Sequence, residues 1–334
     1  ALTAYQIKDY EAALRFYRIN DKQARDLKSA TKMVEAFDGQ THILQLQKKY
    51  EEAEEVCNKL LDVENEELER MKPFIMEELI QIKTRQGKVD EAIKLTEALV
   101  KADDAGWYFV RLKGWVLHEA GRSEEASKAY VDAIERLEKS DGLKPDEQEK
   151  WVDRIRYQLS NVFVEMGQVE KSVEQLKALL KRKPDSPSYN NDLGYIWADH
   201  DMNLEEAEKL IRKALVEDKK LRDAIKDLPP ADNKDNAAYL DSLGWVLYKK
   251  KQYAEAKKPL LDAVKEDDGK HLEIYDHLAD VQTALGEKAE AIATWKKALD
   301  LDANTRRDLR RRAEIIKKLK AAEGKDTPAP VEKK

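Results

Sequence analysis

Residues able to carry out acid–base or metal chemistry are few and scattered in this chain. The five histidines are spread over 334 residues. His271 and His277 lie six positions apart, a spacing that does not place them on one face of a helix. The sequence contains no glycine-rich phosphate loop, nucleophile elbow or HExxH pair. We therefore predict that the chain is not an enzyme, binds no cofactor and holds no metal ion.

Two further candidates for chemistry have simpler structural interpretations. Cys57 is the only cysteine, so no disulfide can form within the chain. Its position on an apolar helix face predicts a buried, unreactive thiol. Asp199, His200 and Asp201 are consecutive in a segment typical of a turn, and we expect them to be solvated.

The elements that position these residues follow a repeated pattern. The spacing of small and large apolar residues predicts two helices in residues 242–264 and two more in residues 278–303. In each segment a small residue lies where the two helices cross, with large apolar residues around it. The small residues are Gly244, Ala256 and Ala263 in the first segment and Ala279, Ala291 and Ala298 in the second. Neither helix of such a pair can bury its apolar face alone, so the pairs must stack.

Weaker copies of the pattern occupy residues 41–62, 79–103, 112–134, 159–184 and 192–215. The small residue of the second helix, which is Ser172 in one copy, advances from Ala53 to Ala291 in steps of 39, 34, 46, 35, 49 and 35 residues. The longer steps require insertions, which we place near 18–32, 139–150 and 219–236. The first should prolong a helix, the second should form a loop, and the third should extend a helix through Lys226 before Pro229 and Pro230 break it.

This pattern resembles the tetratricopeptide repeat (TPR), with its W-x2-L-G-x2-Y…A-x3-F signature, over about eight units. The resemblance implies an all-α fold: a right-handed superhelical solenoid of antiparallel helix pairs over residues 1–303. Residues 190–264 are most similar to bacterial TPR proteins, many of which are exported or lipid-anchored. That similarity favours an exported or membrane-associated bacterial protein, with a cytoplasmic location as the alternative.

Both ends of the chain depart from the repeat. Ala1 falls halfway along a first helix, so we expect a truncated first repeat that a signal peptide, lipid anchor or further domain could precede. Residues 304–320 hold eight Lys or Arg against two acidic residues, a charge of +6 that leaves −12 for the rest of the chain.

We interpret residues 304–322 as a basic helix that caps the last repeat and residues 323–334 as a disordered tail. The residues expected to cover the repeat are Leu309, Ala313, Ile316 and either Leu319 or Lys320, with the charges facing water. The alternative is a basic arm that binds nucleic acid, anionic lipid or an acidic partner.

In tetratricopeptide arrays the first helices of the pairs line a concave groove that binds peptides or partner helices. By this resemblance, the groove residues should be Tyr108, Arg111, Trp115, His118, Arg154, Tyr157, Asn161, Asn191, Tyr195, Asp241, Trp245 and Tyr248. Aromatic rings give contact area at low entropic cost, and arginine forks onto carboxylates. Glu273, Asp276 and Asp280 should make the last unit's groove acidic. The alternative is that Trp115 and Trp245 pack between neighbouring units.

We therefore predict a scaffold that binds a partner peptide or helix in its groove. The alternatives are an architectural subunit of a larger, membrane-associated complex, or a regulatory arm of an enzyme whose catalytic domain precedes Ala1. The acidic body argues against a nucleic-acid partner. We expect the protein to contact a membrane only indirectly or through an N-terminal anchor.

Overall fold

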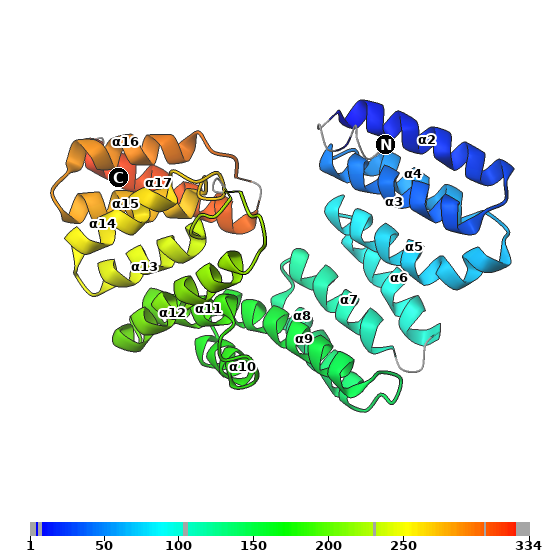
Figure 1. Ribbon diagram of the computed structural model, residues 1–334, viewed down its shortest axis with the longest axis horizontal. Coiled ribbons are helices and arrows are strands. Elements are labelled where there is room, and N and C mark those ends of the chain that lie inside the picture. The colour runs from blue at the N-terminus through cyan, green and yellow to red at the C-terminus, as the bar shows by residue number, and fades with distance from the viewer. Residues whose placement is uncertain (1–4, 6–8, 103–105, 230–231, 304, 325–334) are drawn as a thin grey trace, which may run out of the picture. The chain divides into compact units, whose positions relative to one another are not determined.

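The computed structural model describes residues 5, 9–102, 106–229, 232–303 and 305–324. These residues form sixteen α-helices and no β-strand (Figure 1), which confirms the all-α class. None of the described helices is both long enough and apolar enough to cross a membrane. The predicted half-helix at Ala1 and the tail from residue 325 fall outside the described residues. Glu323, predicted to begin the tail, is the last residue of a helix.

The chain divides into two compact units, Ala1–Ser172 and Val173–Lys334, with the boundary inside α10 (Val169–Arg182). The first unit contains α2 (Tyr10–Asp26), α3 (Ala30–Leu46), α4 (Tyr50–Leu61), α5 (Glu66–Arg85), α6 (Val89–Ala102), α7 (Trp107–Glu119), α8 (Ser123–Glu138) and α9 (Pro145–Glu165). The second unit contains α11 (Pro187–Asp199), α12 (Leu204–Asp223), α13 (Ala237–Lys249), α14 (Tyr253–Ala263), α15 (Leu272–Ala284), α16 (Lys288–Leu299) and α17 (Arg306–Glu323).

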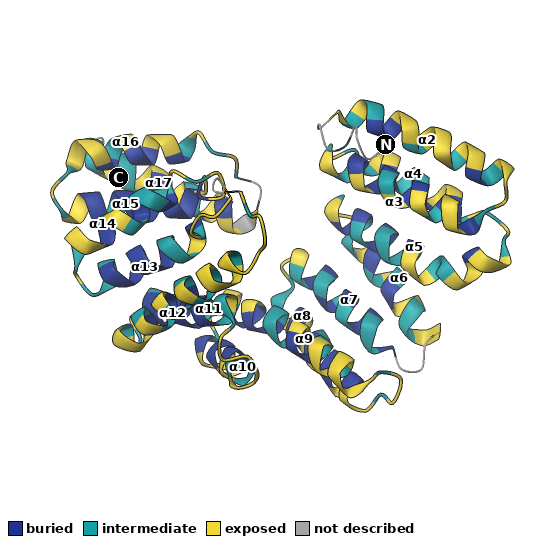
Figure 2. Cartoon of the chain, in the orientation of Figure 1, coloured by how far each residue is buried: buried dark blue, intermediate teal, exposed yellow. Residues whose placement is uncertain are grey.

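Each unit is a stack of helix pairs, whose first and second members we call helix A and helix B. In the first unit the pairs are α3/α4, α5/α6 and α7/α8; in the second they are α11/α12, α13/α14 and α15/α16. From α2 to α9 and from α11 to α17 each helix packs on the next, and A helices of successive pairs also touch, as α5 touches α3 and α7. The buried residues of these helices, dark blue in Figure 2, form the hydrophobic clusters of each unit. This is the predicted solenoid of helix pairs.

Close crossings of helix A over helix B depend on one small residue. Gly114, Gly194 and Gly244 each occupy the eighth position of their A helix. A Cβ atom there would lie 2.9 Å from Tyr130, 2.7 Å from Ile211 and 2.4 Å from Leu260, respectively, all side chains of the following B helix. Such distances leave no room for a methyl group, so these glycines let the helices approach. The predicted close-crossing role of Gly244 is confirmed.

The three predicted insertions are shorter or differently built than expected. Residues 18–32 form the end of α2, a turn and the start of α3, so only the part up to Asp26 prolongs a helix. In residues 139–150 the loop ends at Lys144, because Pro145 opens α9 at a position where its missing N–H costs nothing. Helix α12 stops at Asp223 rather than Lys226. Near this end of α12, Arg222 donates hydrogen bonds to Asn233 and Asp235, which keep the segment after the helix close to it.

Helix α17 packs on α15 and α16, but through a different face than predicted. Ile315 is fully buried, with Leu319 and Ala322 beside it. Leu309 and Ile316 are 58% and 38% exposed, and Ala313 is exposed. The prediction that Leu309, Ala313 and Ile316 cover the repeat was wrong. Ion pairs described below set this rotation.

The substitution Gly244→Ala should lower the free energy of unfolding of the second unit by about 1–3 kcal/mol, because the added methyl group overpacks the contact with Leu260. Denaturant titration followed by the fluorescence of the adjacent Trp245 measures the change.

Gly142→Ala is the matched control, since its Cβ would meet only Ser140 at 3.6 Å. We expect that variant to stay within about 0.5 kcal/mol of wild type. Equal stabilities of Gly244→Ala and wild type would show that the crossing is looser than described.

Candidate interaction sites

The first unit gathers aromatic and arginine side chains on its A helices. We call Trp107, Tyr108, Arg111, Trp151 and Arg154 the aromatic–arginine cluster. The ring centre of Trp151 lies 5.2 Å from the ring centre of Trp107 and 5.6 Å from that of Tyr108, and both pairs have edge-to-face geometry. These contacts join the first turn of α7 to the second turn of α9.

Both arginines of the cluster lie over aromatic rings. The guanidinium carbon of Arg111 is 4.8 Å from the ring centre of Tyr108, and that of Arg154 is 4.5 Å from the ring centre of Trp151. Such stacking is worth about 0.5–1 kcal/mol at exposed sites. It also holds the guanidinium groups in place, which reduces the entropy lost when either arginine binds a ligand.

The two arginines differ in what else they contact. Arg111 lies 3.6 Å from Glu77 of α5, which also accepts a 2.7 Å hydrogen bond from the Tyr108 hydroxyl. Burial, together with this contact to Glu77, raises the pKa of Tyr108 to about 12. Arg154 is exposed and makes no ion pair with any described residue. It is the available cation of the cluster.

The other predicted residues of this unit lie further along the same helices. Trp115 is half-buried and packs against the hydrophobic core on both sides of α7, which favours the alternative that it is structural. His118 forms a 3.1 Å ion pair with Glu165, and this hydrogen bond raises the pKa of the imidazole. Tyr157 is half-buried and Asn161 is exposed.

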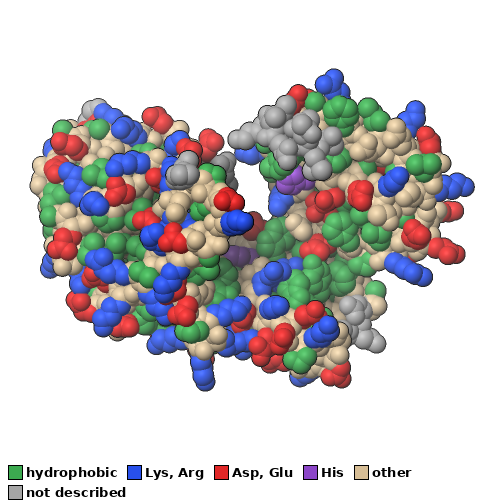
Figure 3. Space-filling view, viewed as in Figure 1, with side chains coloured by type: hydrophobic (Ala, Val, Ile, Leu, Met, Phe, Trp, Pro, Cys, Tyr) green, Lys and Arg blue, Asp and Glu red, His purple; other side chains and the backbone are tan. Residues whose placement is uncertain are grey.

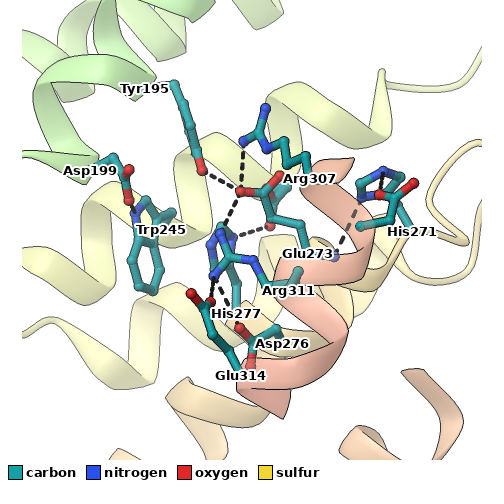
Figure 4. Close-up of polar contacts among 12 residues, drawn as sticks. Tyr195, Asp199, Trp245, His271, Glu273, Asp276, His277, Arg307, Arg311 and Glu314 are labelled. Carbon is teal, nitrogen blue, oxygen red and sulfur yellow. Dashed lines mark hydrogen bonds and ion pairs between the residues drawn. The ribbon is translucent and has the colours of Figure 1, made fainter. Parts of the chain in front are cut away.

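The predicted site residues of the second unit are mostly interior. Trp245 and Asp241 are only 8% and 6% exposed, and Asn191 is buried as well. Trp245 donates to Asp199 at 3.1 Å and stacks on His277 with ring centres 4.0 Å apart (Figure 4). Trp245 and Asp241 therefore pack α13 against α11 and α15. The burial of all three side chains corrects the prediction that they line a groove. Asp199, predicted to be solvated, is half-buried by this contact.

Two tyrosines complete that arrangement. Tyr195 donates a 2.7 Å hydrogen bond to Glu273, and Tyr248 stacks on Trp245 with ring centres 5.0 Å apart. Both are half-buried. Tyr195 connects α11 to α15, and Tyr248 packs on Trp245 of its own helix α13. Each tyrosine therefore makes a structural contact.

The acidic residues predicted to face a ligand in the last unit instead bind α17. Glu273 accepts hydrogen bonds from Arg307 and Arg311, both at 2.8 Å, as Figure 4 shows. Asp276, which is fully buried, accepts from Arg311 and Lys318 at 3.1 and 2.9 Å.

Lys318 also reaches Asp280 at 2.6 Å. The side chains of Arg311 and Lys318 therefore point into the protein, which corrects the prediction that the charges of α17 face water. The three acidic residues predicted to face a ligand are therefore bound by the chain itself.

This network shifts the ionisation of its members. Burial alone would raise the pKa of Glu273, but Arg307, His277 and Arg311 outweigh it and hold the pKa at about 2. Burial would lower the pKa of His277, but Asp241 and Glu273 outweigh it and raise the pKa. For Asp280 burial dominates, and with Asp276 it raises the pKa.

The residues considered for chemistry are buried or make structural contacts. Cys57 is fully buried, and burial raises the pKa of its thiol, as the sequence predicted. His277 forms a 2.9 Å hydrogen bond with Asp241, whereas His271 caps the N-terminus of α15. Among the described residues, no group of three or more His, Cys, Asp or Glu is arranged to hold a metal ion.

Sequence reasoning found Tyr108, Arg111 and Arg154 but missed Trp107, Trp151 and Glu77. Trp151 precedes Arg154 by three positions and Trp107 precedes Arg111 by four, which are spacings that place side chains on one helix face. That spacing could have identified both tryptophans. Glu77 carries no comparable signal, because its partners lie more than 30 positions away.

Replacing Arg311 by methionine should destabilise the second unit. The change leaves Glu273 and Asp276 short of a cation in a buried setting, and removing one partner of a buried pair costs about 3–5 kcal/mol. Because Arg307 and Lys318 remain, we expect the low end of that range, measured by denaturant unfolding.

Arg310→Met on the same helix is the control, because Arg310 is exposed and unpaired among the described residues. Equal losses in both variants would mean that α17 is held by apolar contacts alone.

The raised pKa of His277 predicts a pH dependence. A group whose pKa is higher in the folded state stabilises that state fully below its unfolded pKa of about 6.5. That stabilisation is lost as the pH rises through the folded pKa. The unfolding free energy of the second unit should therefore fall as the pH rises above about 6.5. His277→Gln should flatten this slope, whereas His200→Gln, at an exposed position, should not. NMR titration of the imidazole provides the direct check: an unshifted or lowered pKa for His277 would contradict the argument.

Comparison with known proteins agrees with the helix pairs described above. A family model described as a tetratricopeptide repeat-like domain matches residues 5–154, and two tetratricopeptide repeat models match residues 157–227 and 272–305. The TPR repeat-containing protein PA4667 of Pseudomonas aeruginosa is 29% identical over 181 residues, which are 54% of this chain and 26% of that protein. The chain thus spans about a quarter of that relative's length.

Solved structures show the same fold. A tetratricopeptide repeat protein from Parabacteroides merdae superposes with a TM-score of 0.59 at 13% identity, covering 84% of this chain and 98% of that one. A chain of the APC/C hetero-tetramer Cut9–Hcn1 gives a TM-score of 0.55 at 16% identity, covering 86% and 51%, respectively. On its repeats, its helix pairs and these matches, the chain belongs to the tetratricopeptide repeat family.

Proposed function

We propose that this protein is an interaction scaffold that binds a segment of a partner protein on the A helices of its first unit. The tetratricopeptide fold suggests a protein-interaction role in general. The observation that carries the specific proposal is the exposed Arg154, stacked on Trp151 and unpaired among the described residues. An ordered cation beside aromatic rings suits a carboxylate flanked by an apolar side chain.

The chemistry of the cluster defines the partner segment. Trp107 and Trp151 are half-buried, so each offers part of a large, rigid surface to an apolar anchor. Glu77 already neutralises Arg111, which leaves Arg154 to receive an acidic residue. Asn161, two turns beyond Arg154 on α9, can hydrogen-bond the backbone of an extended segment.

The surface charge argues for a protein partner. Basic and acidic side chains alternate over the visible face of each unit, without a continuous basic area (Figure 3). Nucleic-acid binding requires a clustered positive surface, and the chain as a whole carries a net charge of −6. The proposed site combines one available cation with aromatic rings, which suits an acidic peptide better than a phosphate backbone.

Substitutions in the cluster test the proposal. A photoreactive residue at Asn161 would first capture the native partner for identification by mass spectrometry. Trp151→Ala should then weaken binding of that partner by about 2 kcal/mol or more. Arg154→Ala should slow association and reduce its salt dependence, because an exposed charge acts mainly on the encounter. Calorimetric and kinetic titrations measure both effects.

Two variants keep this test clear of folding effects. Arg154→Glu changes only an exposed side chain, so the fold should persist while the acidic segment is repelled. Lys128→Ala removes an exposed cation from α8, a B helix, and should leave binding unchanged. If Arg154→Glu binds the partner like wild type, the site lies elsewhere and the protein is better described as an architectural subunit that uses other surfaces.

A further inference from the structure

Helix α17 is built and placed as a helix A. It follows α16 and also touches α15, as α15 itself follows α14 and touches α13. The tenth residue of α7, α11, α13 and α15 is buried in each case: Val116, Ile196, Val246 and Val281. The tenth residue of α17 is Ile315, which is fully buried. The helix therefore has the same rotation as the A helices before it.

The face that each earlier A helix turns to its helix B is open on α17. The eighth residue is Gly194 in α11, Gly244 in α13 and Ala279 in α15, each covered by the following helix. In α17 the eighth residue is Ala313, which is exposed.

The neighbouring position on that face is open as well. The eleventh residue is Trp197 in α11 and Leu247 in α13, both buried, and Gln282 in α15, which accepts a hydrogen bond from Thr294 of the following helix α16. In α17 the eleventh residue is Ile316, which is 38% exposed, and Leu309 on the same face is 58% exposed. The close-crossing surface of a helix pair is thus present without its second helix among the described residues.

The open face is also purely basic. Arg310, Lys317 and Lys320 lie beside or within the stripe of Leu309, Ala313 and Ile316, and all three are exposed with no ion pair to any described residue. The acidic residues of α17 point elsewhere: Asp308 closes the capping box, Glu314 lies by Arg311, and Glu323 pairs with Lys296. A helix that covers this face would meet only positive charge.

We propose that this face of α17, the stripe of Leu309, Ala313 and Ile316 with Arg310, Lys317 and Lys320, binds an acidic amphipathic helix of a partner protein. That helix takes the position on α17 that α12, α14 and α16 take on α11, α13 and α15. A second copy of α17 is disfavoured because it would bring like charges together. Residues 325–334 contain Pro328, Pro330 and a single large apolar residue, Val331, so they offer no apolar stripe with helix-B spacing.

The chain's own helix B supplies the probe for a test. A peptide with the sequence of α16 keeps Ala291, Trp295 and Ala298, the residues that pack on α15. Replacing Lys288, Lys296 and Lys297 by Glu makes it acidic, and a hydrocarbon staple across the exposed positions of Ala289 and Ala293 keeps it helical. The unmodified, basic sequence with the same staple is the control peptide. Fluorescence anisotropy measures binding to the full chain.

We expect the acidic peptide to bind saturably and at least tenfold more tightly than the basic peptide. The variants Ile316→Ser and Lys317→Glu should each weaken binding about tenfold, the first by removing an apolar anchor and the second by reversing a charge. Lys297→Glu makes the same charge change at an exposed position of α16 and should have no effect. Both α17 changes are at exposed positions, so thermal melting should stay at the wild-type value.

Other results would overturn the proposal. The acidic peptide could fail to bind saturably, or it could bind no more tightly than the basic peptide. Equal affinity of the acidic peptide for wild type, Ile316→Ser and Lys317→Glu would also contradict the proposal. Binding of the chain to vesicles rich in phosphatidylglycerol, lost in Lys317→Glu and without peptide binding, would assign the face to a membrane surface instead. Dimerisation lost in Ile316→Ser would assign it to a second copy. None of these outcomes depends on the aromatic–arginine cluster of the first unit.

Discussion

The close crossing of helix A over helix B is the constraint on which the rest of each unit depends. At the eighth position of α13 there is no space for a side chain, because a Cβ atom at Gly244 would lie only 2.4 Å from Leu260. Fixing that contact fixes the rotation of helix A. The residues one or two turns earlier, such as Tyr108 and Arg111 on α7, are then directed toward neighbouring A helices. A steric requirement in the core thus decides which side chains form the interaction surface.

The parts of the fold that depend on local spacing could be predicted from the sequence. Small residues such as Gly194 and Ala291 identify the crossings because any larger side chain would clash there. Gly286 identifies a turn between helices, and its φ of +81° is a conformation that costs glycine little. These signals recur with the repeat, so each copy supports the others. The helix pairs and the family followed from them.

The parts that depend on pairing between distant residues could not be predicted. Periodicity alone offers two apolar faces on α17, one through Ile316 and one through Ile315, and does not rank them. The choice is made by Glu273 and Asp276, which bind Arg311 across more than 30 positions of sequence. Trp245 was misassigned for a related reason: its partners, His277 and Asp199, come from two other helices. An aromatic residue beside a crossing glycine can face a groove or a neighbouring helix, and only the neighbour decides.

The ion pairs of α17 therefore act on specificity more than on net stability. Desolvating Asp276 and its cations offsets much of their attraction, so a purely apolar cap could be equally stable. An apolar cap, however, could rotate to bury whichever stripe is larger. Buried carboxylates prevent this rotation, because turning Arg311 and Lys318 away would leave Glu273 and Asp276 unpaired. The helix is held with its cations inward and Leu309 and Ile316 outward, an arrangement that hydrophobic burial alone would not select.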